Sequence, residues 1–372
     1  MADDAEPTVA QDEHRFPCGQ CGAQLRFAPG QRHLTCQYCG HEQDIPQSEA
    51  AREIALTTLD LRDALSNHLP PQAMEEHRVL GCSNCGAQVE FDPAQHAAQC
   101  PFCGSPVVTD TGTQRQIKPA AVLPFKLTER QAHESMRTWL RRLWFAPNKL
   151  KDYARSDGSR LDGLYVPYWA FDSDTHSRYS GERGDAYYET RSVTRDGKTQ
   201  TEQVRKIRWT RVSGRVQRRF NDVLVMAAQS LPPAYTRNLE PWMLGELAPY
   251  APEFLSGFRA EGYTVQLPEG HVQALSRMDE VIRQDVRRDI GGDEQRVHSV
   301  DTDHQDERFK HLLLPIWMAA YRYRDKTYRF VVNGQTGKVQ GERPWSAWKI
   351  AGAIVVAVVI AAAVFYVSQL QG

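Results

Sequence analysis

One cysteine pattern is written twice in this chain, 64 positions apart. CGQCGAQLRF at 18–27 recurs as CSNCGAQVEF at 82–91, and CQYCG at 36–40 recurs as CPFCG at 100–104. Such a repeat marks each copy as one structural unit. The repeat uses all eight cysteines of the chain, so the pairing of these thiols constrains the fold more than any other feature.

The spacing inside each copy predicts a metal site. Two C-x2-C pairs stand fourteen residues apart, so two short loops can present four thiolates to one tetrahedral ion. A glycine follows each pair and can adopt positive φ, which lets the turn aim backbone N–H groups at the sulfurs. We predict two zinc ribbons whose metal ligands are Cys18, Cys21, Cys36, Cys39, Cys82, Cys85, Cys100 and Cys103.

Other ligand arrangements fit the pattern less well. Iron in a rubredoxin-like or iron–sulfur site is the alternative metal, and sharing of cysteine pairs between the copies is the alternative connectivity. Close repetition favours a site closed within each copy. Four cysteines leave the metal no open position, so two structural zinc ions are expected, and the nearby histidines are read as surface residues: His14, His33, His41 and His96.

The C-terminal region predicts a membrane anchor. Residues 350–367 contain no charge and no proline, and 18 helical residues rise about 27 Å, near the thickness of a bilayer core. A buried core helix is the alternative. Trp345, Trp348 and Tyr366 suit the interfaces, and the basic residues precede the span, so the positive-inside rule places the N-terminal part in the cytosol of a bacterial inner membrane, single-pass.

This topology supports metal over disulfides, because cytosolic thiols stay reduced. The fold class expected is multidomain: two small β zinc ribbons, a mixed α+β domain and one C-terminal transmembrane helix. The predicted order is a disordered acidic tail (1–13), zinc ribbon 1 (14–46), a helical linker (47–78), zinc ribbon 2 (79–110), the mixed α+β cytosolic domain (117–344) and the transmembrane anchor (345–370).

Within the α+β domain, local signals predict several elements. Thr128-Glu-Arg-Gln131 is a capping box, so a helix should follow it. Residues 272–290 have helical periodicity. The motif L-x-x-P-x-W occurs at 164–169 and 312–317 and suggests two related β units, while 321–339 alternates like hairpin strands with an Asn-Gly turn signal.

Three further stretches suggest ligands but have simpler interpretations. Residues 205–219 hold seven basic residues and no acid, which suits nucleic acid or anionic lipid, although a strand pair with a basic solvent face is favoured. Asp301, Asp303, His304 and Asp306 lack the glycine of a calcium loop and are read as a solvated loop. Gly197-Lys-Thr199 is read as a hairpin turn.

The segments PYAPEFLSGFRAEGY (249–263), LLLPIWMAAYRY (312–323) and VVNGQTGKVQGERPWSAWK (331–349) resemble a family of bacterial membrane-anchored double zinc-ribbon proteins. Members often carry a primosomal or helicase label, which this chain does not support, since it has no phosphate-binding loop. Some members resemble membrane partners of phage-shock-type and SPFH or virion-core-like proteins. The resemblance implies a recruiting or scaffolding role in envelope stress.

We therefore expect a tail-anchored adaptor that recruits a cytosolic protein through its zinc ribbons. The alternative is a membrane-tethered nucleic-acid binder linked to replication or transcription, and a third hypothesis is an enzyme in residues 117–344. Known catalytic motifs are absent from the sequence, so no enzyme is expected. Small residues every four positions could also pair two anchors as a homodimer: Ala353, Ala357 and Ala361.

Overall fold

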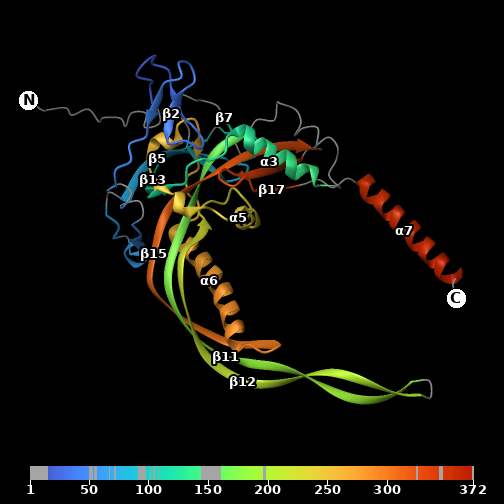
Figure 1. Ribbon diagram of the computed structural model, residues 1–372. Helices are drawn as coiled ribbons and strands as arrows, with labels where there is room; N and C mark the ends of the chain where they lie inside the picture. Colours follow the sequence, from blue (N-terminus) through green and yellow to red (C-terminus); the bar gives the residue numbers. More distant parts are fainter. Residues whose placement is uncertain are drawn as a thin grey trace, which may run out of the picture.

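Three long strands form the main sheet of the computed structural model. They are β11 (Asp162–Arg195), β12 (Lys198–Met226) and β15 (Glu294–Tyr323), antiparallel and in the order β12, β11, β15. Figure 1 shows that they bend together into an arc. The structure describes residues 16–49, 53, 57–66, 68–70, 73–90, 98–100, 102–103, 105–107, 109–143, 161–195, 198–323, 326–342 and 347–370.

Bulges lie part-way along these strands, and β-bulges bend the strand that carries them. The register of β11 shifts between Phe171 and Ser173 against β12, and again nearby against β15. An ion pair braces this region, because the Nζ of buried Lys310 lies 2.6 Å from the half-buried carboxylate of Asp222. The left-handed backbone of Asp222 (φ 54°) marks the bulge on the β12 side.

Helix α6 (Leu267–Ile290) lies along the concave side of the arc (Figure 1). Its first turn contains Pro268, and it ends at Gly291 with φ 66°. Buried positions recur every three or four residues and pack on the inner face of the sheet: Leu267, Gly270, Ala274, Met278, Ile282, Val286 and Ile290. The helix predicted over 272–290 is confirmed and begins earlier, at Leu267.

Gly270 allows α6 to approach the sheet. A Cβ at this position would lie 2.5 Å from Cδ1 of Trp169, which is fully buried and donates from Nε1 to the Val265 carbonyl at 2.9 Å. Gly270→Ala should therefore lower the free energy of unfolding by about 1–3 kcal/mol through overpacking. This reverses the gain of roughly 0.5–1 kcal/mol that alanine brings inside an ordinary helix.

Chemical denaturation of the detergent-solubilised protein measures this effect. Ser276→Ala is the matched control, because Ser276 is exposed on the same helix. The control should be neutral or stabilising, and an equally stable Gly270→Ala variant would contradict the close packing.

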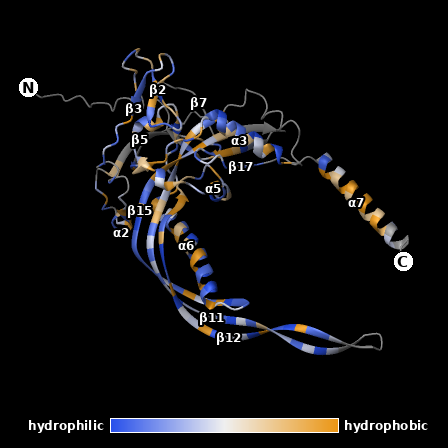
Figure 2. Cartoon of the chain, in the orientation of Figure 1, coloured by the Kyte–Doolittle hydropathy of each residue, from blue (hydrophilic) through white to orange (hydrophobic). Residues whose placement is uncertain are grey.

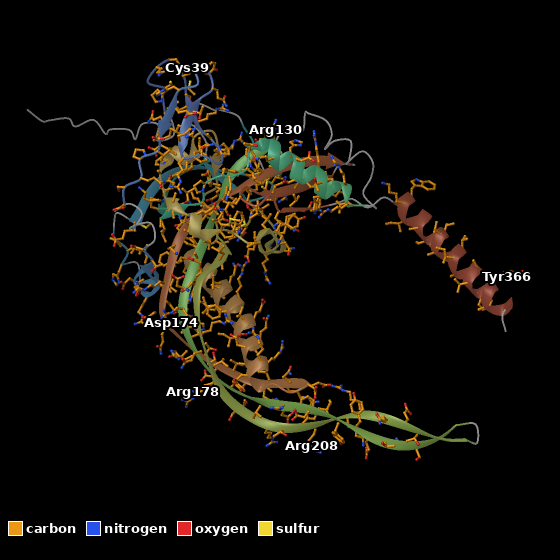
Figure 3. All side chains as sticks on the ribbon, in the orientation of Figure 1. Cys39, Arg130, Asp174, Arg178, Arg208 and Tyr366 are labelled. Carbon is orange, nitrogen blue, oxygen red and sulfur yellow. The ribbon has the colours of Figure 1, made fainter. Side chains whose placement is uncertain are left out.

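The basic run 205–219 lies on β12, as the favoured interpretation predicted, and most of its charges are paired. Arg219 makes a bidentate contact with Asp174, both distances being 2.7 Å, and Arg218 binds Asp285 of α6. Arg205 pairs with Glu294, Lys206 with Glu189, and Arg208 stacks over Tyr187. Figure 3 labels Asp174, Arg178 and Arg208 along these strands.

The acidic stretch 301–306 was predicted as a loop, and this is wrong. All of these residues belong to β15, where Asp303 is opposite His176 and Asp301 is opposite Arg178 of β11. Asp301 and Asp303 are exposed, while Thr302 and His304 between and after them are half-buried. This alternation lets the stretch form a strand whose acidic face is in solvent. Of the hairpin turn predicted at residues 197–199, Lys198 and Thr199 belong to β12, and residue 197 lies outside the described residues.

The sheet becomes mixed at the end of the arc opposite the hairpin. Strand β10 (Ala121–Val122) runs parallel to β15, and β14 (Arg259–Ala260) runs parallel to β11. The two L-x-x-P-x-W motifs are neighbours, with Leu164 opposite Ile316 and Trp169 opposite His311. Three further strands of this sheet are β13 (Ala248–Pro249), β16 (Lys326–Asn333) and β17 (Val339–Gly341), and the Asn-Gly turn predicted at 333–334 lies between the last two.

Short helices cover this end of the sheet. Helix α3 (Glu129–Arg141) begins at the predicted capping box, where the Thr128 N–H donates to Gln131 Oε1 at 2.9 Å. The other short elements are α5 (Pro233–Leu239), η2 (Leu244–Glu246) and η3 (Pro252–Leu255).

The predicted helical linker 47–78 is helical only in part, because Glu49 and Glu53 are helical among its described residues but strands interrupt the segment. Its described part contains β4 (Leu59–Asp60), which pairs with β15, then the five-residue helix α2 (Leu61–Leu65) and the start of β5 (Met74–Gly81). Residues 59–60 form a strand despite the helical propensity of the segment, because the edge of β15 offers backbone hydrogen-bond partners and Leu61 is buried in the core beside it. Residues 50–52 and 54–56 lie outside the described residues.

Helix α7 (Ala347–Leu370) differs from α6 in having no polar face (Figure 2). Its stretch Trp348–Tyr366 is long and apolar enough to cross a membrane, and none of that stretch is buried in the protein. A soluble helix without partners would leave these side chains in water.

Candidate metal centres

The structure brings the eight predicted cysteines together as two groups of four, one in each copy of the repeat. Within each group all four Sγ atoms lie within 4.8 Å of one another. In the first group Cys18 and Cys39 are 3.6 Å apart, and Cys21 and Cys36 are 3.5 Å apart. A disulfide needs about 2.05 Å, so these are free thiols arranged as a ligand cage.

The second group has the same geometry. Cys82 and Cys103 approach to 3.5 Å, and Cys85 and Cys100 to 3.6 Å. A hydroxyl joins this group, because Ser105 Oγ lies 2.6 Å from Cys103 Sγ. Each group can hold one metal ion.

Glycine-terminated turns shape the cysteine loops. Gly22, Gly40 and Gly86 each have φ 74°, and each donates its N–H to the carbonyl of the first cysteine in its pair, at 2.8 to 3.0 Å. A Cβ at these three positions would meet nothing within 4 Å, so backbone conformation, and not space, requires glycine. Gly104 lies outside the described residues.

Thiol electrostatics in the first group call for a cation. The backbone N–H groups of Cys39 and Tyr38 lower the pKa of Cys36 to about 6. The N–H of His41 acts on Cys39 in the same direction, yet desolvation and the three neighbouring thiols raise the pKa of Cys39 to about 12. Some of the sulfurs ionise readily, but four thiolates can coexist only with positive charge among them.

The second group shows the same division. A hydrogen bond with the Cys100 thiol is the main cause that lowers the pKa of Cys85 to about 5. The same interaction raises the pKa of Cys100. A metal ion at the centre would remove the conflict by stabilising every thiolate.

We call the first cysteine repeat, residues 16–45, the first module, and the domain built around β11, β12 and β15 the main domain. The first module packs on the main domain. Its sheet consists of β1 (Leu25–Phe27), β2 (His33–Cys36) and β3 (Glu42–Asp44). Phe27 is buried against Phe254 and Phe258, with ring centroids 5.3 and 6.3 Å away. Ser256 closes the contact, since its Oγ donates to the Leu25 carbonyl at 2.6 Å.

The second cysteine repeat, residues 82–107, is the second module, and both of its cysteine loops contribute buried residues to the core of the main domain. Strand β6 (Gln88–Glu90) extends the sheet of β5 and β9 (Thr109–Ile117), and β7 (Ala98–Gln99) pairs with β8 (Pro106–Val107). Phe102 is fully buried in a core cluster with residues of β11 and β15.

The two copies therefore differ in the burial of an equivalent aromatic side chain. Phe102 corresponds in the repeat to Tyr38, whose side chain is 85% exposed. Figure 3 places the neighbouring Cys39 at the outer end of the first module. The first copy thus presents its second cysteine loop to solvent, while the second copy uses that loop as core.

The histidines near the clusters have other surroundings. His33 Nε2 lies 3.6 Å from Glu42 Oε1, which makes it a partner of a surface carboxylate. His41 contributes its backbone carbonyl to Cys36 N–H at 2.8 Å. His14 and His96 lie outside the described residues.

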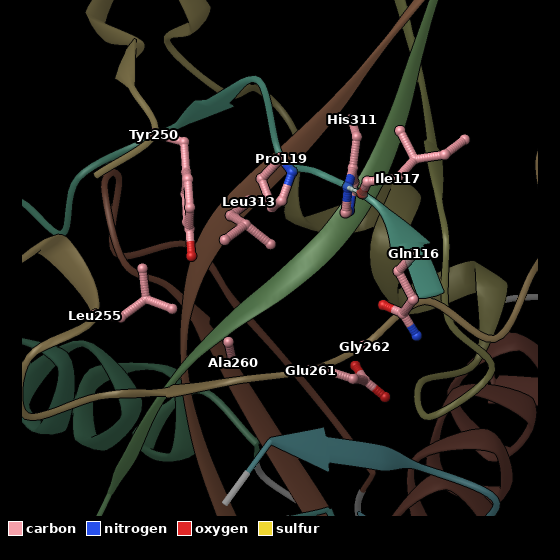
Figure 4. A pocket seen from close by; sticks show the side chains of 10 residues that line it. All are labelled: Gln116, Ile117, Pro119, Tyr250, Leu255, Ala260, Glu261, Gly262, His311 and Leu313. Atoms are coloured by element: carbon pink, nitrogen blue, oxygen red, sulfur yellow. Dashed lines mark hydrogen bonds between the residues drawn. The ribbon is translucent and has the colours of Figure 1, made fainter. Parts of the chain in front are cut away.

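Buried polar residues near the second module had no signal in the sequence. Glu261 is 2% exposed, and burial raises the pKa of its carboxyl well above the usual range. Ser230 Oγ donates to it at 2.9 Å. Figure 4 shows Glu261 beside Gln116 and His311 around a cavity of about 10 Å³, room for a single water at most.

A larger cavity of about 440 Å³ lies between the second module and α6. Cys85 lines it from one side and Arg277 of α6 from the other. Arg277 already contacts the Leu224 carbonyl, and its NH1 lies 3.5 Å from Glu240.

Comparison with known proteins gives a relative but no function. No family model matches the chain, and no solved structure matches it. The chain is similar to the uncharacterized protein YdjG of Bacillus subtilis (strain 168), with 25% identity over 339 residues that cover 90% of this chain and 92% of the relative.

Proposed function

We propose that the chain is a membrane-anchored adaptor whose two cysteine clusters hold structural zinc in zinc-ribbon modules. Its apolar C-terminal helix anchors it in a bacterial inner membrane with the rest in the cytosol. The exposed end of the first module recruits a cytosolic protein. The observation that carries the proposal is the contrast between exposed Tyr38 and buried Phe102.

Zinc suits both clusters in geometry and charge. With Zn–S bonds of about 2.3 Å, neighbouring sulfurs of a tetrahedral site lie about 3.8 Å apart. The closest Sγ pairs here are 3.5 to 3.6 Å apart. When bound, the ion supplies positive charge among four thiolates, and four protein ligands leave it no position for a substrate. The sites therefore favour a structural role over catalysis.

Packing supports the first module as the docking element. One side of the module is committed to the main domain through Phe27, and the loop around Tyr38 faces away from it. An exposed aromatic on a rigid, metal-closed turn loses little entropy on binding, which is the property of an interface anchor.

A single substitution tests this role. Tyr38→Ser should abolish recovery of a cytosolic partner when the full chain is purified from solubilised membranes, because the docking aromatic is lost. Val272→Ser is the matched control, since Val272 is also an exposed apolar side chain, 63% exposed, and lies on α6. Quantitative mass spectrometry compares proteins that co-purify with each variant.

Metal content keeps this test interpretable. Both variants should retain two zinc ions per chain, because the Tyr38 side chain is exposed and only its backbone N–H serves Cys36. If every co-purifying protein is recovered equally with Tyr38→Ser and Val272→Ser, the docking role of the first module is wrong. Deletion of the module is a poorer test, because it would also expose Phe254.

The nucleic-acid alternative predicts a different result. Binding of DNA by the full chain, lost steeply with salt and on neutralising Arg211 and Arg215, would support it. The pairing of Arg205, Arg218 and Arg219 with acids reduces the positive field available to phosphates.

A further inference from the structure

The β11–β12 hairpin extends beyond the rest of the sheet as an arm (Figure 1). The last residue of β11 that pairs with β15 is Gly184, opposite Glu294, whereas the hairpin continues to the pair Arg195 and Lys198. We call residues 185–195 and 198–208 the arm. Two strands alone are marginally stable in water, and a third strand is the usual remedy.

One edge of the arm is open, because β15, the neighbour of β11 on that side, begins only at Glu294, opposite Gly184. Gly184 accepts at its carbonyl from the Asp293 N–H at 2.9 Å, and Ala186 donates its N–H to Asp293 Oδ2 at 2.8 Å. Backbone groups alternate in direction along a strand, so the even-numbered residues of β11 point their N–H and C=O groups to this edge. Past Ala186 these are Tyr188, Thr190, Ser192 and Thr194, which pair with β12 on one side, while on this edge no strand of the described residues pairs with them.

The free edge is complementary to itself. Antiparallel pairing of two copies about Thr190, the midpoint of 185–195, sets even residues opposite even residues, as the ladder requires. It also sets Glu189 opposite Arg191 and position 185, an aspartate, opposite position 195, an arginine. Position 187, a tyrosine, is set opposite position 193, a valine, and pairs of an aromatic with a β-branched residue favour strand pairing. Residues of opposite charge thus occupy opposing register positions at 189 and 191 and at 185 and 195.

We propose that two copies of this chain associate through the β11 edges of their arms, antiparallel and two-fold symmetric about Thr190. The joined arms form a four-stranded sheet in the order β12, β11, β11, β12. Pairing of Tyr188, Thr190 and Ser192 with the other copy supplies about six new backbone hydrogen bonds. This association does not depend on the adaptor role.

The other edge of the arm is less suited to a second copy. Odd-numbered residues of β12 face that edge, because Tyr187 and Lys206 are the inward pair across the hairpin. Two-fold pairing about Gln203 would set Arg208 opposite position 198, a lysine. Like charges directly opposite each other destabilise a strand pair.

Short ladders bind weakly in dilute solution, so the association is tested in membranes. Confinement of both copies to one bilayer raises their effective concentration. For the test, a photo-reactive benzoylphenylalanine replaces Thr190 in the full chain, and two copies with different affinity tags are co-expressed. Gln203 is the control position, because it is opposite Thr190 at the same level of the hairpin but on the other strand. Irradiation should link the two tags from position 190 and not from 203.

Charge reversal tests the register. Arg191→Glu places glutamate opposite glutamate twice in a pair of identical copies, and Glu189→Arg places arginine opposite arginine twice. Each variant should reduce its own cross-link roughly tenfold, since each cross-strand pair contributes up to about 1 kcal/mol. Mixed copies, one with R191E and the other with E189R, restore opposite charges at every contact and should cross-link as the unchanged chain does.

The mixed pair of variants distinguishes charge repulsion between copies from misfolding of the arm. Glu189 also pairs with Lys206 in its own hairpin, so a damaged E189R arm would fail to cross-link in every combination. Equal cross-linking of the R191E chain with itself and with E189R would overturn the proposal. Products from position 190 that contain only other proteins would overturn it as well.

Discussion

Replacing Cys100 by serine should remove one of two zinc ions and unfold part of the main domain. A structural zinc contributes on the order of 10 kcal/mol of binding free energy, comparable to the whole stability of a domain. Phe102 and the buried sulfur of Cys100 share a core cluster with Leu164, Val166 and Leu314 of the long strands. Loss of the metal therefore removes packing from β11 and β15.

The equivalent change in the first module should act more locally. Cys36→Ser should also remove one metal ion, and Cys36 shares a core cluster with Tyr165 and Leu313. The second cysteine loop of the first module nevertheless adds little to the core, because Tyr38 is exposed where the equivalent Phe102 is fully buried. Elemental analysis of the purified full chain should give two zinc ions, and one in each variant. Amide hydrogen exchange should rise across residues 162–170 in C100S and stay close to the unchanged level there in C36S.

Two outcomes would contradict this account. A chain that contains mainly iron, or one metal ion in all, would refute two zinc sites. Equal exchange in the long strands of both variants would show that the modules support the domain alike.

Charges placed in α7 should release the protein from the membrane. Each arginine at the centre of a membrane helix costs about 2.5–3.5 kcal/mol of insertion free energy, so Ala357→Arg with Ile360→Arg costs roughly 6 kcal/mol. Within the part of the chain that the structure describes, neither side chain has protein partners that could compensate, because the stretch Trp348–Tyr366 is not buried. Fractionation should move the variant from the membrane to the soluble fraction.

Leucine at the same two positions is the control. Ala357→Leu with Ile360→Leu changes size but keeps the helix apolar, so this variant should remain in the membrane. A soluble unchanged chain would show that α7 has another role. If the arginine variant stays bound after a high-salt wash, a second membrane contact must exist in the protein.

The sequence was sufficient where a feature depends on neighbouring residues. Paired cysteines with a following glycine specify a tight turn through covalent geometry and φ alone, and Gly22, Gly40 and Gly86 adopt the same angle. The capping box at Thr128 and the helix 272–290 followed from hydrogen bonding and periodicity within one turn. A long apolar run needs no tertiary information to form a helix that can span a bilayer.

Features that depend on distant residues were out of reach. The segment around Leu59 forms a strand because β15 offers it an edge, and residues 301–306 are a strand because β11 pairs with them. The buried Glu261 and its Ser230 partner are 31 residues apart in sequence, so no local pattern signals their contact.

The duplicated modules separate the two kinds of information most clearly. The repeat by itself determined that each copy gathers four thiols, because the ligands of each cluster lie in one short segment that closes on itself. Only the tertiary structure decided that Tyr38 is 85% exposed while Phe102 is fully buried, since the surroundings of a side chain come from elements far away in the chain. Equivalent cysteine loops of the repeat thus present an exposed aromatic in one copy and a core aromatic in the other, because burial depends on what packs against the loop.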